Sequence, residues 1–151
     1  MSKIDKYIRI YDQLQELLVD VKDPVARMAS MAALLHNKIE YYFWTGFYVL
    51  HDNRLIVGPY QGALACIELE HNKGVCWAAV KQKKTIIVPD VKKFPDHIEC
   101  DSRSKSEIAV PVFTHGGKVG AVLDVDSTML DSFNDTDAQG LEELVKLIIL
   151  K

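Results

Sequence analysis

The chain has 151 residues, of which 48% are apolar and 26% are charged, and its formal net charge is −3. This length predicts one domain that buries a core without disulfide staples, and the composition excludes a disordered chain. The slight excess of acidic residues argues against a nucleic-acid-binding surface, which needs clustered Lys and Arg. The short basic clusters at 81–84 and 92–93 are interpreted as solvated faces.

The N-terminal sequence does not resemble a targeting segment. MSKIDKYIRIYDQLQEL carries charges every few residues, and no stretch of the chain reaches the ~18 uncharged apolar residues of a membrane span. We therefore expect a cytoplasmic protein. Its three cysteines are then expected to be reduced, and because their number is odd any disulfide should be transient rather than part of a framework.

Two amphipathic helices are predicted at the start of the chain. Asp23 followed by Pro24 is typical of a helix beginning, because Asp caps free N–H groups and Pro is tolerated at the first helical position. Before it, residues 4–18 place apolar side chains at three- and four-residue intervals, which is the helical period. That stripe consists of Ile4, Tyr7, Ile8, Tyr11, Leu14 and Leu18.

The middle of the chain is predicted to be mostly β structure. Aromatic and β-branched residues over 41–60 flank turn residues at 51–53, which indicates a β-hairpin. A further strand is expected in ALACIELE, around Cys66. A short helix over 74–84 and a β segment over 85–88 follow.

Residues 91–105 have no hydrophobic period and contain proline, charges and serines, so they are predicted to form a loop. Cys100 lies inside this loop. The last predicted element is a helix that begins at Asn134 or Asp135. Its expected core residues are Leu141, Leu144, Val145 and Ile148.

The segment SEIAVPVFTHGGKVGAVLDVDS predicts a second hairpin. Gly116 and Gly117 suit a two-residue primed turn, because both glycines can adopt positive φ. That turn would place Phe113 opposite Gly120.

The same register gathers three carboxylates on one face of this hairpin. Glu107 falls opposite Asp126 and Ala109 opposite Asp124, and alternation of side chains puts the three acids together. Like charges across an antiparallel pair are destabilising, so the cluster needs a cause. One cause is a face open to water. The other is function, in which crowding raises one carboxyl pKa or a cationic ligand sits among the acids.

The cysteines are the other candidate chemical groups. Cys76 falls at the expected helix start, where the dipole stabilises a thiolate, so local chemistry makes it the first candidate nucleophile. The alternative is a small buried hydrophobe beside Trp77, and Cys66 in a strand invites the same interpretation. Cys100 lies in a polar loop shortly before Glu107, where exposed reactive groups occur, although its acidic neighbours would raise its pKa.

No metal site is predicted. His97 lies three residues before Cys100 and His71 five before Cys76, but the cysteine spacings do not match those of structural zinc sites. The other histidines are interpreted as surface residues: His36, His51 and His115.

A family pattern runs through the chain. WTGFYVL, GPYQG, the AC pair at Cys66, KGVC, HIECDS, SEIAVP and VLDVDS occur in this order. Together they closely resemble the free methionine (R)-sulfoxide reductases, enzymes built on a GAF domain, over about residues 24–146. The resemblance implies an α+β fold with a central antiparallel sheet of about six strands flanked by helices. It implies one GAF-like domain over 1–151, with 1–22 as a helix packed on it.

The resemblance also assigns roles to the cysteines. By motif position Cys100 matches the catalytic cysteine and Cys66 the main resolving one, with Cys76 as a possible second partner. Trp77 follows Cys76 where the family usually has glycine, and its ring is expected to restrict access to that thiol. Glu99 precedes Cys100 where a small residue is commoner.

The resemblance assigns the acids and two aromatic residues to the substrate site. Glu107 or Asp126 would be the proton donor, and Asp124 would bind the substrate ammonium group. Trp44 matches the pocket aromatic of the family, and Tyr60 would add to the same wall.

The implied reaction is reduction of free L-methionine (R)-sulfoxide to methionine in the cytoplasm by a homodimer, with thioredoxin as reductant and no cofactor. A thiolate attacks the sulfoxide sulfur while a carboxyl group protonates its oxygen, and the resulting sulfenic acid condenses with a second thiol. The alternative is a GAF domain that acts as a small-ligand or thiol redox sensor without turnover.

Overall fold

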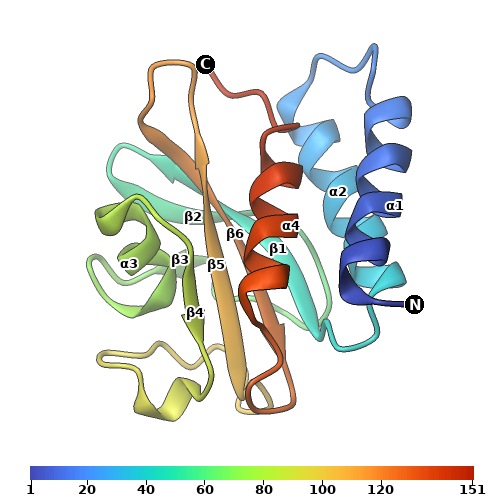
Figure 1. Cartoon of the computed structure of the whole chain (residues 1–151). Helices are drawn as coiled ribbons and strands as arrows, with labels where there is room; N and C mark the ends of the chain where they lie inside the picture. The colour runs from blue at the N-terminus through green and yellow to red at the C-terminus, as the bar shows by residue number, and fades with distance from the viewer.

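The computed structural model describes all 151 residues as one antiparallel sheet with helices on both faces (Figure 1). The helices are α1 (Lys3–Leu17), α2 (Pro24–Lys38), α3 (Gly74–Gln82) and α4 (Asp135–Val145), with a 3₁₀ turn, η1, at Val91–Lys93. The strands are β1 (Trp44–His51), β2 (Arg54–Gln61), β3 (Glu68–Leu69), β4 (Ile86–Val88), β5 (Ser106–Phe113) and β6 (Val119–Ser127).

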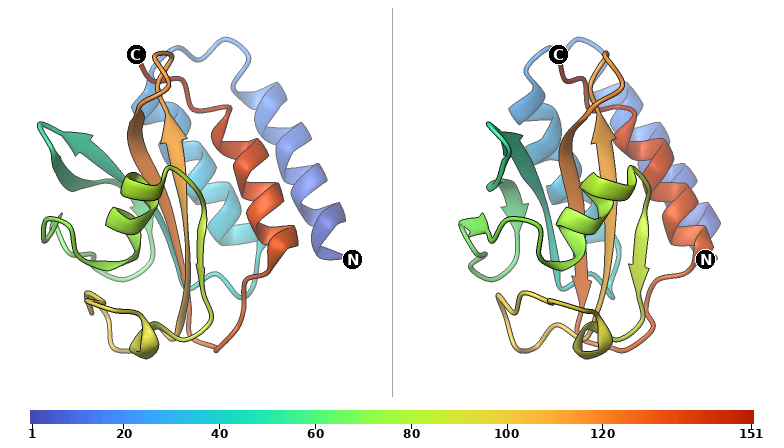
Figure 2. Two further views of the ribbon diagram at one scale, coloured as in Figure 1. Left: turned by 60° about the vertical axis from the view of Figure 1, so that its left-hand side comes forward. Right: turned by 90° about the vertical axis from the view of Figure 1, so that its left-hand side faces the viewer.

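The six strands are arranged in the order β3-β2-β1-β6-β5-β4, and each neighbouring pair is antiparallel. Helices α2 and α4 pack on one face, α1 packs against them from outside, and α3 covers part of the opposite face (Figure 2). The core on the α2 and α4 face contains 23 buried residues, whereas the core beneath α3 contains 12. Because the core beneath α3 is small, part of the sheet face formed by β1, β5 and β6 remains uncovered and can line a pocket.

The helix starts follow the predicted capping chemistry. The Asp23 side chain accepts hydrogen bonds from the first N–H groups of α2, and Asn134 forms a capping box with Asp137 at α4. The predicted stripe on α1 is partly wrong. Ile4 and Ile8 are exposed, because the buried face of α1 is centred on the i, i+3, i+7 row instead. That row consists of Tyr7, Ile10 and Leu14. No helix of the chain has the length and apolar character needed to cross a bilayer.

The first hairpin, β1 with β2, forms as predicted. Asp52 and Asn53 both have positive φ, which is the conformation of a primed two-residue turn. The strand expected around Cys66 is wrong, since β3 contains only Glu68–Leu69. Cys66 lies in the loop before β3, because its carbonyl accepts a hydrogen bond from the Tyr48 hydroxyl instead of a ladder partner (3.1 Å).

The second hairpin, β5 with β6, has the predicted register near the acids but not at its tip. Gly117 has φ +82° whereas Gly116 has no positive φ, so the two-residue primed turn is wrong. Phe113 pairs with Val119, not Gly120, and a bulge then restores the expected pairing. The loop over 114–118 and the bulge compensate each other, so the pairs that gather the carboxylates are unchanged.

One buried carboxylate ties α1 to the rest of the chain. Asp137 is fully buried, and its two oxygens accept hydrogen bonds from the Tyr7 hydroxyl (2.7 Å) and Lys3 Nζ (2.6 Å). The Tyr41 hydroxyl and the Asn134 N–H donate to the same carboxylate. Each carboxylate oxygen of Asp137 therefore accepts two hydrogen bonds.

Asp137→Asn should lower the free energy of unfolding by about 3 kcal/mol, because the change leaves Lys3 and the hydroxyl donors without a charged acceptor. Chemical denaturation of the purified variant measures this change. Asp135→Asn, an exposed neighbour in the same helical turn, is the matched control and should stay within about 0.5 kcal/mol of wild type. Equal stability of the two variants would contradict a stabilising role for the buried network.

Candidate active site

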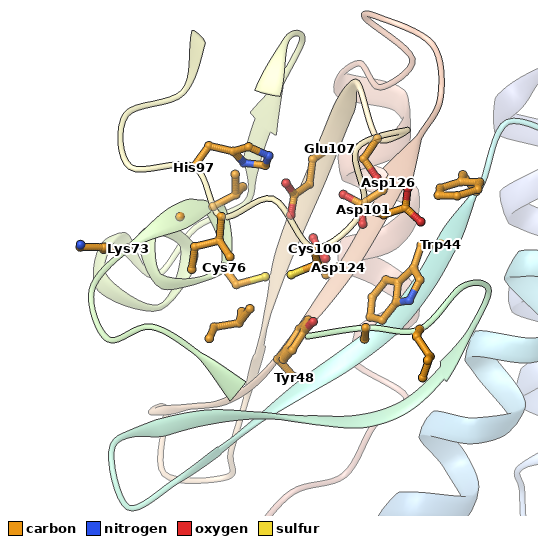
Figure 3. A pocket seen from close by; sticks show the side chains of 18 residues that line it. Trp44, Tyr48, Lys73, Cys76, His97, Cys100, Asp101, Glu107, Asp124 and Asp126 are labelled. Atoms are coloured by element: carbon orange, nitrogen blue, oxygen red, sulfur yellow. The ribbon is translucent and has the colours of Figure 1, made fainter. Parts of the chain in front are cut away.

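A pocket opens on the α3 face of the sheet, between the first turn of α3, the strands β1, β5 and β6, and two loops (Figure 3). The loops are those that carry Cys66 and Cys100. The labelled side chains converge on this space from elements far apart in the sequence. They are Trp44, Tyr48, Lys73, Cys76, His97, Cys100, Asp101, Glu107, Asp124 and Asp126.

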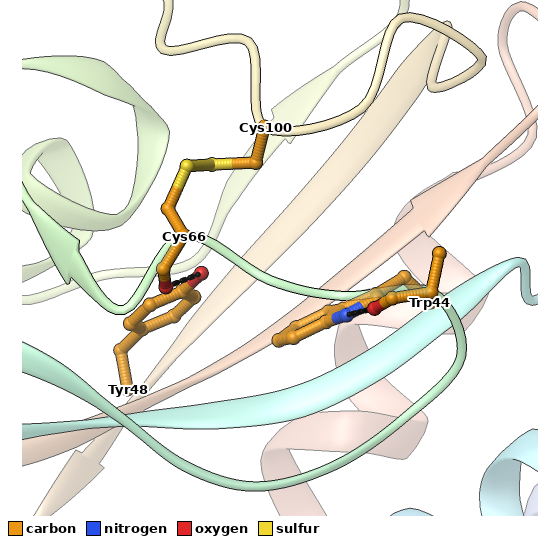
Figure 4. The surroundings of a disulfide bond; sticks show 5 residues. Trp44, Tyr48, Cys66 and Cys100 are labelled. Atoms are coloured by element: carbon orange, nitrogen blue, oxygen red, sulfur yellow. Dashed lines mark hydrogen bonds between the residues drawn. A yellow bond between two sulfur atoms is a disulfide. The ribbon is translucent and has the colours of Figure 1, made fainter.

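Two of the three cysteines are joined at the rim of this pocket. Cys66 and Cys100 form a disulfide with a Cα–Cα separation of 5.4 Å (Figure 4). Cys100 is exposed and Cys66 is half-buried, so solvent reaches the bridge. Both cysteines lie in loops, which allows the bridge to open without disturbing the sheet.

Two side chains of β1 hold the loop that carries Cys66 through hydrogen bonds. Trp44 Nε1 donates to the carbonyl of Ala63 (3.0 Å), and the Tyr48 hydroxyl donates to the carbonyl of Cys66 (Figure 4). These two aromatic side chains stack with ring centroids 5.8 Å apart. The same residues therefore shape the pocket wall and position one half of the disulfide.

The third cysteine has a different environment. Cys76 lies in the first turn of α3, as predicted, but it is 4% exposed and unbridged. Burial raises the pKa of its thiol, and the charges of Asp124 and Glu107 raise it further. The expectation that the helix dipole makes Cys76 the reactive thiolate is therefore wrong, because desolvation and neighbouring acids outweigh the dipole. Trp77 is buried beside it in the same core.

The three carboxylates come together as the hairpin register predicted. Glu107 and Asp124 are each 6% exposed, and Asp126 is half-buried. A face open to water therefore does not explain the cluster. Burial raises the pKa of Glu107 and of Asp126 well above the ordinary carboxyl range, and the charge of Asp124 adds to both shifts.

The pKa of Asp124 is raised less than the pKa values of the other two acids. Burial raises its pKa too, but hydrogen bonds from Glu107, Cys76 and Asp126 oppose that rise. One oxygen of Asp124, Oδ1, is buried and has no hydrogen-bond partner. Two carboxyl groups with strongly raised pKa values beside Asp124 place potential proton donors next to a buried acceptor oxygen, in a site with little water.

The stack of aromatic rings formed by Trp44 and Tyr48 continues behind the pocket. Tyr60 does not line the pocket but stacks on Trp44, with ring centroids 5.3 Å apart. Tyr48 was missed by the sequence argument, although the two-residue period of β1 places it on the same sheet face as Trp44. Burial raises the pKa of the Tyr48 hydroxyl, so it remains a hydrogen-bond donor.

The loop that carries Cys100 is held by a local ion pair. Arg103 donates two hydrogen bonds to the carboxylate of Asp101 and lowers its pKa to about 2. The Arg103 guanidinium also lies 4.8 Å from the ring centroid of Phe43. These contacts hold an ion pair next to Cys100 at neutral pH.

One potential cation site was not predicted from cysteine spacing. A thiol sulfur and two carboxylate oxygens, from Cys76, Glu107 and Asp124, lie within 4.8 Å of one another. Thiolate and carboxylate ligands could hold a small divalent cation. The histidines do not contribute to it: His97 lines the pocket elsewhere, and His36, expected at the surface, is half-buried with Nδ1 3.1 Å from Thr45 Oγ1.

Comparison with known proteins places this site in a family. The GAF domain family matches residues 31–149 of the chain. The chain is 37% identical over 145 residues to the free methionine-R-sulfoxide reductase of Escherichia coli. This match covers 96% of this chain and 87% of that protein. The chain belongs to the GAF-domain family of free methionine-R-sulfoxide reductases.

Solved structures of this family agree with the fold. The free methionine-R-sulfoxide reductase of Neisseria meningitidis in complex with its substrate superposes with a TM-score of 0.93 at 39% identity, covering 98% of this chain and 89% of that one. The reduced form of the Staphylococcus aureus enzyme gives a TM-score of 0.90 at 42% identity, covering 94% and 92%. The family resemblance and the α+β GAF fold inferred from the motifs are thus confirmed.

Proposed function

We infer that this protein is an enzyme that reduces free methionine (R)-sulfoxide to methionine by thiol chemistry. The observation that carries this inference is the convergence of a disulfide-bonded cysteine pair and a buried carboxyl cluster on one aromatic-walled pocket. Relatives of similar sequence and structure bear this name, and one of them was solved in complex with its substrate.

We assign the first step to Cys100. Its thiolate attacks the sulfoxide sulfur, the S–O bond breaks, and the oxygen leaves the substrate as part of a cysteine sulfenic acid while methionine is released. This step needs a proton for the oxygen. Glu107 and Asp126 support that role, because burial keeps them protonated at a pH where an ordinary carboxyl group is ionised.

We assign the second step to Cys66. Its thiol condenses with the sulfenic acid of Cys100, which releases water and forms the disulfide. The bridge between these two cysteines supports the assignment, and the burial of Cys76 argues against that residue as the resolving thiol. A dithiol reductant then reduces the bridge by exchange, and we propose thioredoxin for this role.

The carboxylate of Asp124 accounts for selection of the free amino acid. Free methionine sulfoxide carries an ammonium group that a methionine residue within a protein lacks, and the unpartnered Asp124 oxygen offers it an acceptor. The Trp44 and Tyr48 rings supply an apolar wall for the side chain of the substrate.

Two further proposals concern the setting of the enzyme. A cycle that consumes a dithiol reductant suits a reducing compartment, so we place the protein in the cytoplasm. We also propose a homodimer. The outward stripe of α1, where Ile4 and Ile8 are 56% and 55% exposed, offers apolar surface that a second copy could cover.

The test is steady-state turnover with thioredoxin, thioredoxin reductase and NADPH. NADPH consumption is expected with free methionine (R)-sulfoxide, and little or none with the S epimer or with N-acetyl-methionine (R)-sulfoxide, which has no ammonium group. Binding of the free R epimer without any turnover by the reduced protein would favour the ligand sensor instead.

A further inference from the structure

The loop between β2 and β3, residues 62–67, presents apolar side chains to solvent on both sides of Cys66; we call it the Cys66 loop. Leu64 is 85% exposed and Ile67 is 74% exposed. They lie two residues before and one residue after the cysteine of the disulfide. Single exposed apolar residues are ordinary, but two beside a solvent-accessible disulfide form a local patch.

The backbone of the Cys66 loop enforces this exposure. Its carbonyl groups at Ala63 and Cys66 accept hydrogen bonds from Trp44 and Tyr48, and the Ile67 carbonyl accepts one from the N–H of Val57 (2.8 Å). These three hydrogen bonds hold the loop in the conformation that exposes its apolar side chains. Its geometry keeps them facing outward whether or not a partner is present.

The two sulfur atoms of the disulfide differ in what surrounds them. Cys100 is flanked by Glu99 and by Asp101, whose carboxylate is paired with Arg103. Cys66 is flanked by Ala65 and Ile67, which carry no charge. The attacking group in disulfide exchange is a thiolate, so the Glu99 carboxylate beside Cys100 opposes its approach, whereas the two neighbours of Cys66 carry no charge.

We propose that Leu64 and Ile67 form the docking surface for the dithiol protein that reduces the Cys66–Cys100 disulfide, and that this reductant attacks the sulfur of Cys66. The proposal rests on the proposed function. A reductant thiolate forms a bond to the Cys66 sulfur, the Cys66–Cys100 bond breaks, and Cys100 leaves as a thiolate at the mouth of the pocket. The second thiol of the reductant then displaces Cys66, so the reductant becomes a disulfide and both cysteines are reduced.

The first experiment separates docking from chemistry by changing the reductant. Ile67 does not line the pocket, so Ile67→Ser is the cleaner variant, and Leu64→Ser/Ile67→Ser removes the whole patch. The kcat/KM for thioredoxin should fall several-fold in the single variant and about tenfold in the double variant. Turnover of Ile67→Ser with dithiothreitol, a small dithiol that needs no docking surface, should match wild type. Val19→Ser, an apolar residue 76% exposed in the turn between α1 and α2, is the matched control and should keep wild-type values with both reductants.

Each other result of this experiment overturns the docking surface. If the double variant and Val19→Ser had equal kcat/KM values for thioredoxin, the patch would have no role in docking. An equal loss with dithiothreitol in Ile67→Ser would assign the residue to the chemistry. A change of oligomeric state in Ile67→Ser alone would assign the patch to contact between copies of this chain. Absence of dithiothreitol-driven turnover in wild type would instead refute the proposed function.

The second experiment tests which sulfur is attacked. A thioredoxin whose second active-site cysteine is serine should be trapped as a mixed disulfide with the oxidised protein, because it cannot complete the exchange. Peptide mapping should find the bond at Cys66. A bond at Cys100 would overturn the direction of attack.

Discussion

Cys100→Ser should abolish methionine release even in a single turnover, when no recycling is needed. A serine hydroxyl is a poor nucleophile toward a sulfoxide sulfur, and neither remaining thiol is placed to replace Cys100: Cys66 does not line the pocket, and Cys76 is buried with a raised pKa. Mixing reduced enzyme in excess with free methionine (R)-sulfoxide and quantifying methionine measures this step. We expect a loss of at least about 10³-fold.

Cys66→Ser should separate the two halves of the reaction. It keeps the attacking thiol, so about one methionine per enzyme should form, but thioredoxin-driven cycling should stop because the sulfenic acid has no partner. Cys76→Ser is the matched control and should retain cycling. A Cys66→Ser enzyme that is inactive in single turnover would exchange the roles of the two bridged cysteines, and a Cys76→Ser enzyme that cannot cycle would make Cys76 the resolving thiol.

The rules for helix capping and turn residues predicted those parts of the fold that depend on one short-range interaction. The pairing of Glu107 with Asp126 is correct although the turn from which it was predicted is not, whereas the cap at Asp23 and the hairpin turn over 51–53 depend on residues close together in the sequence. Such features were visible from spacing and turn chemistry alone.

Features set by long-range packing were not visible in the same way. Cys76 carries the local signal of a reactive thiolate, and only the sheet beneath α3, with its acids, shows why the opposite holds. Cys66 was expected in a strand because its residues alternate, yet a hydroxyl from β1 takes its carbonyl out of the ladder. The carboxylates of the second hairpin and the family motifs, not the helix position, favour Cys100 as the nucleophile.

Glu107→Gln should slow the chemical step by about 10²-fold while changing substrate affinity much less, because the amide cannot transfer the proton that the sulfoxide oxygen needs. In wild type, the single-turnover rate should fall as pH rises through the raised pKa of this group. That alkaline decline should be absent from Glu107→Gln. Single-turnover rates across pH, with binding measured separately, test both statements. A wild-type rate in the variant would leave Asp126 as the proton donor.

The same substitution should stabilise the protein at neutral and alkaline pH. The pKa of Glu107 is higher in the folded chain than in the unfolded one, so between these two values the unfolded chain loses a proton that the folded chain keeps. Wild-type stability therefore declines as pH rises through this window, by about 1.4 kcal/mol for each unit of pKa difference. Glutamine cannot ionise, so the unfolding free energy of the variant should decline less steeply.

The decline should be reduced rather than removed, because Asp126 and Asp124 share the buried cluster and titrate with Glu107. Denaturation of wild type, Glu107→Gln and the control Glu99→Gln between pH 5 and pH 9 measures this effect. Glu99 is exposed and should follow the wild-type curve. If Glu107→Gln were both slower and less stable at every pH, the carboxyl group would be a structural hydrogen-bond partner. A variant that is slower but more stable would show that the enzyme keeps a destabilising buried acid because the proton transfer requires it.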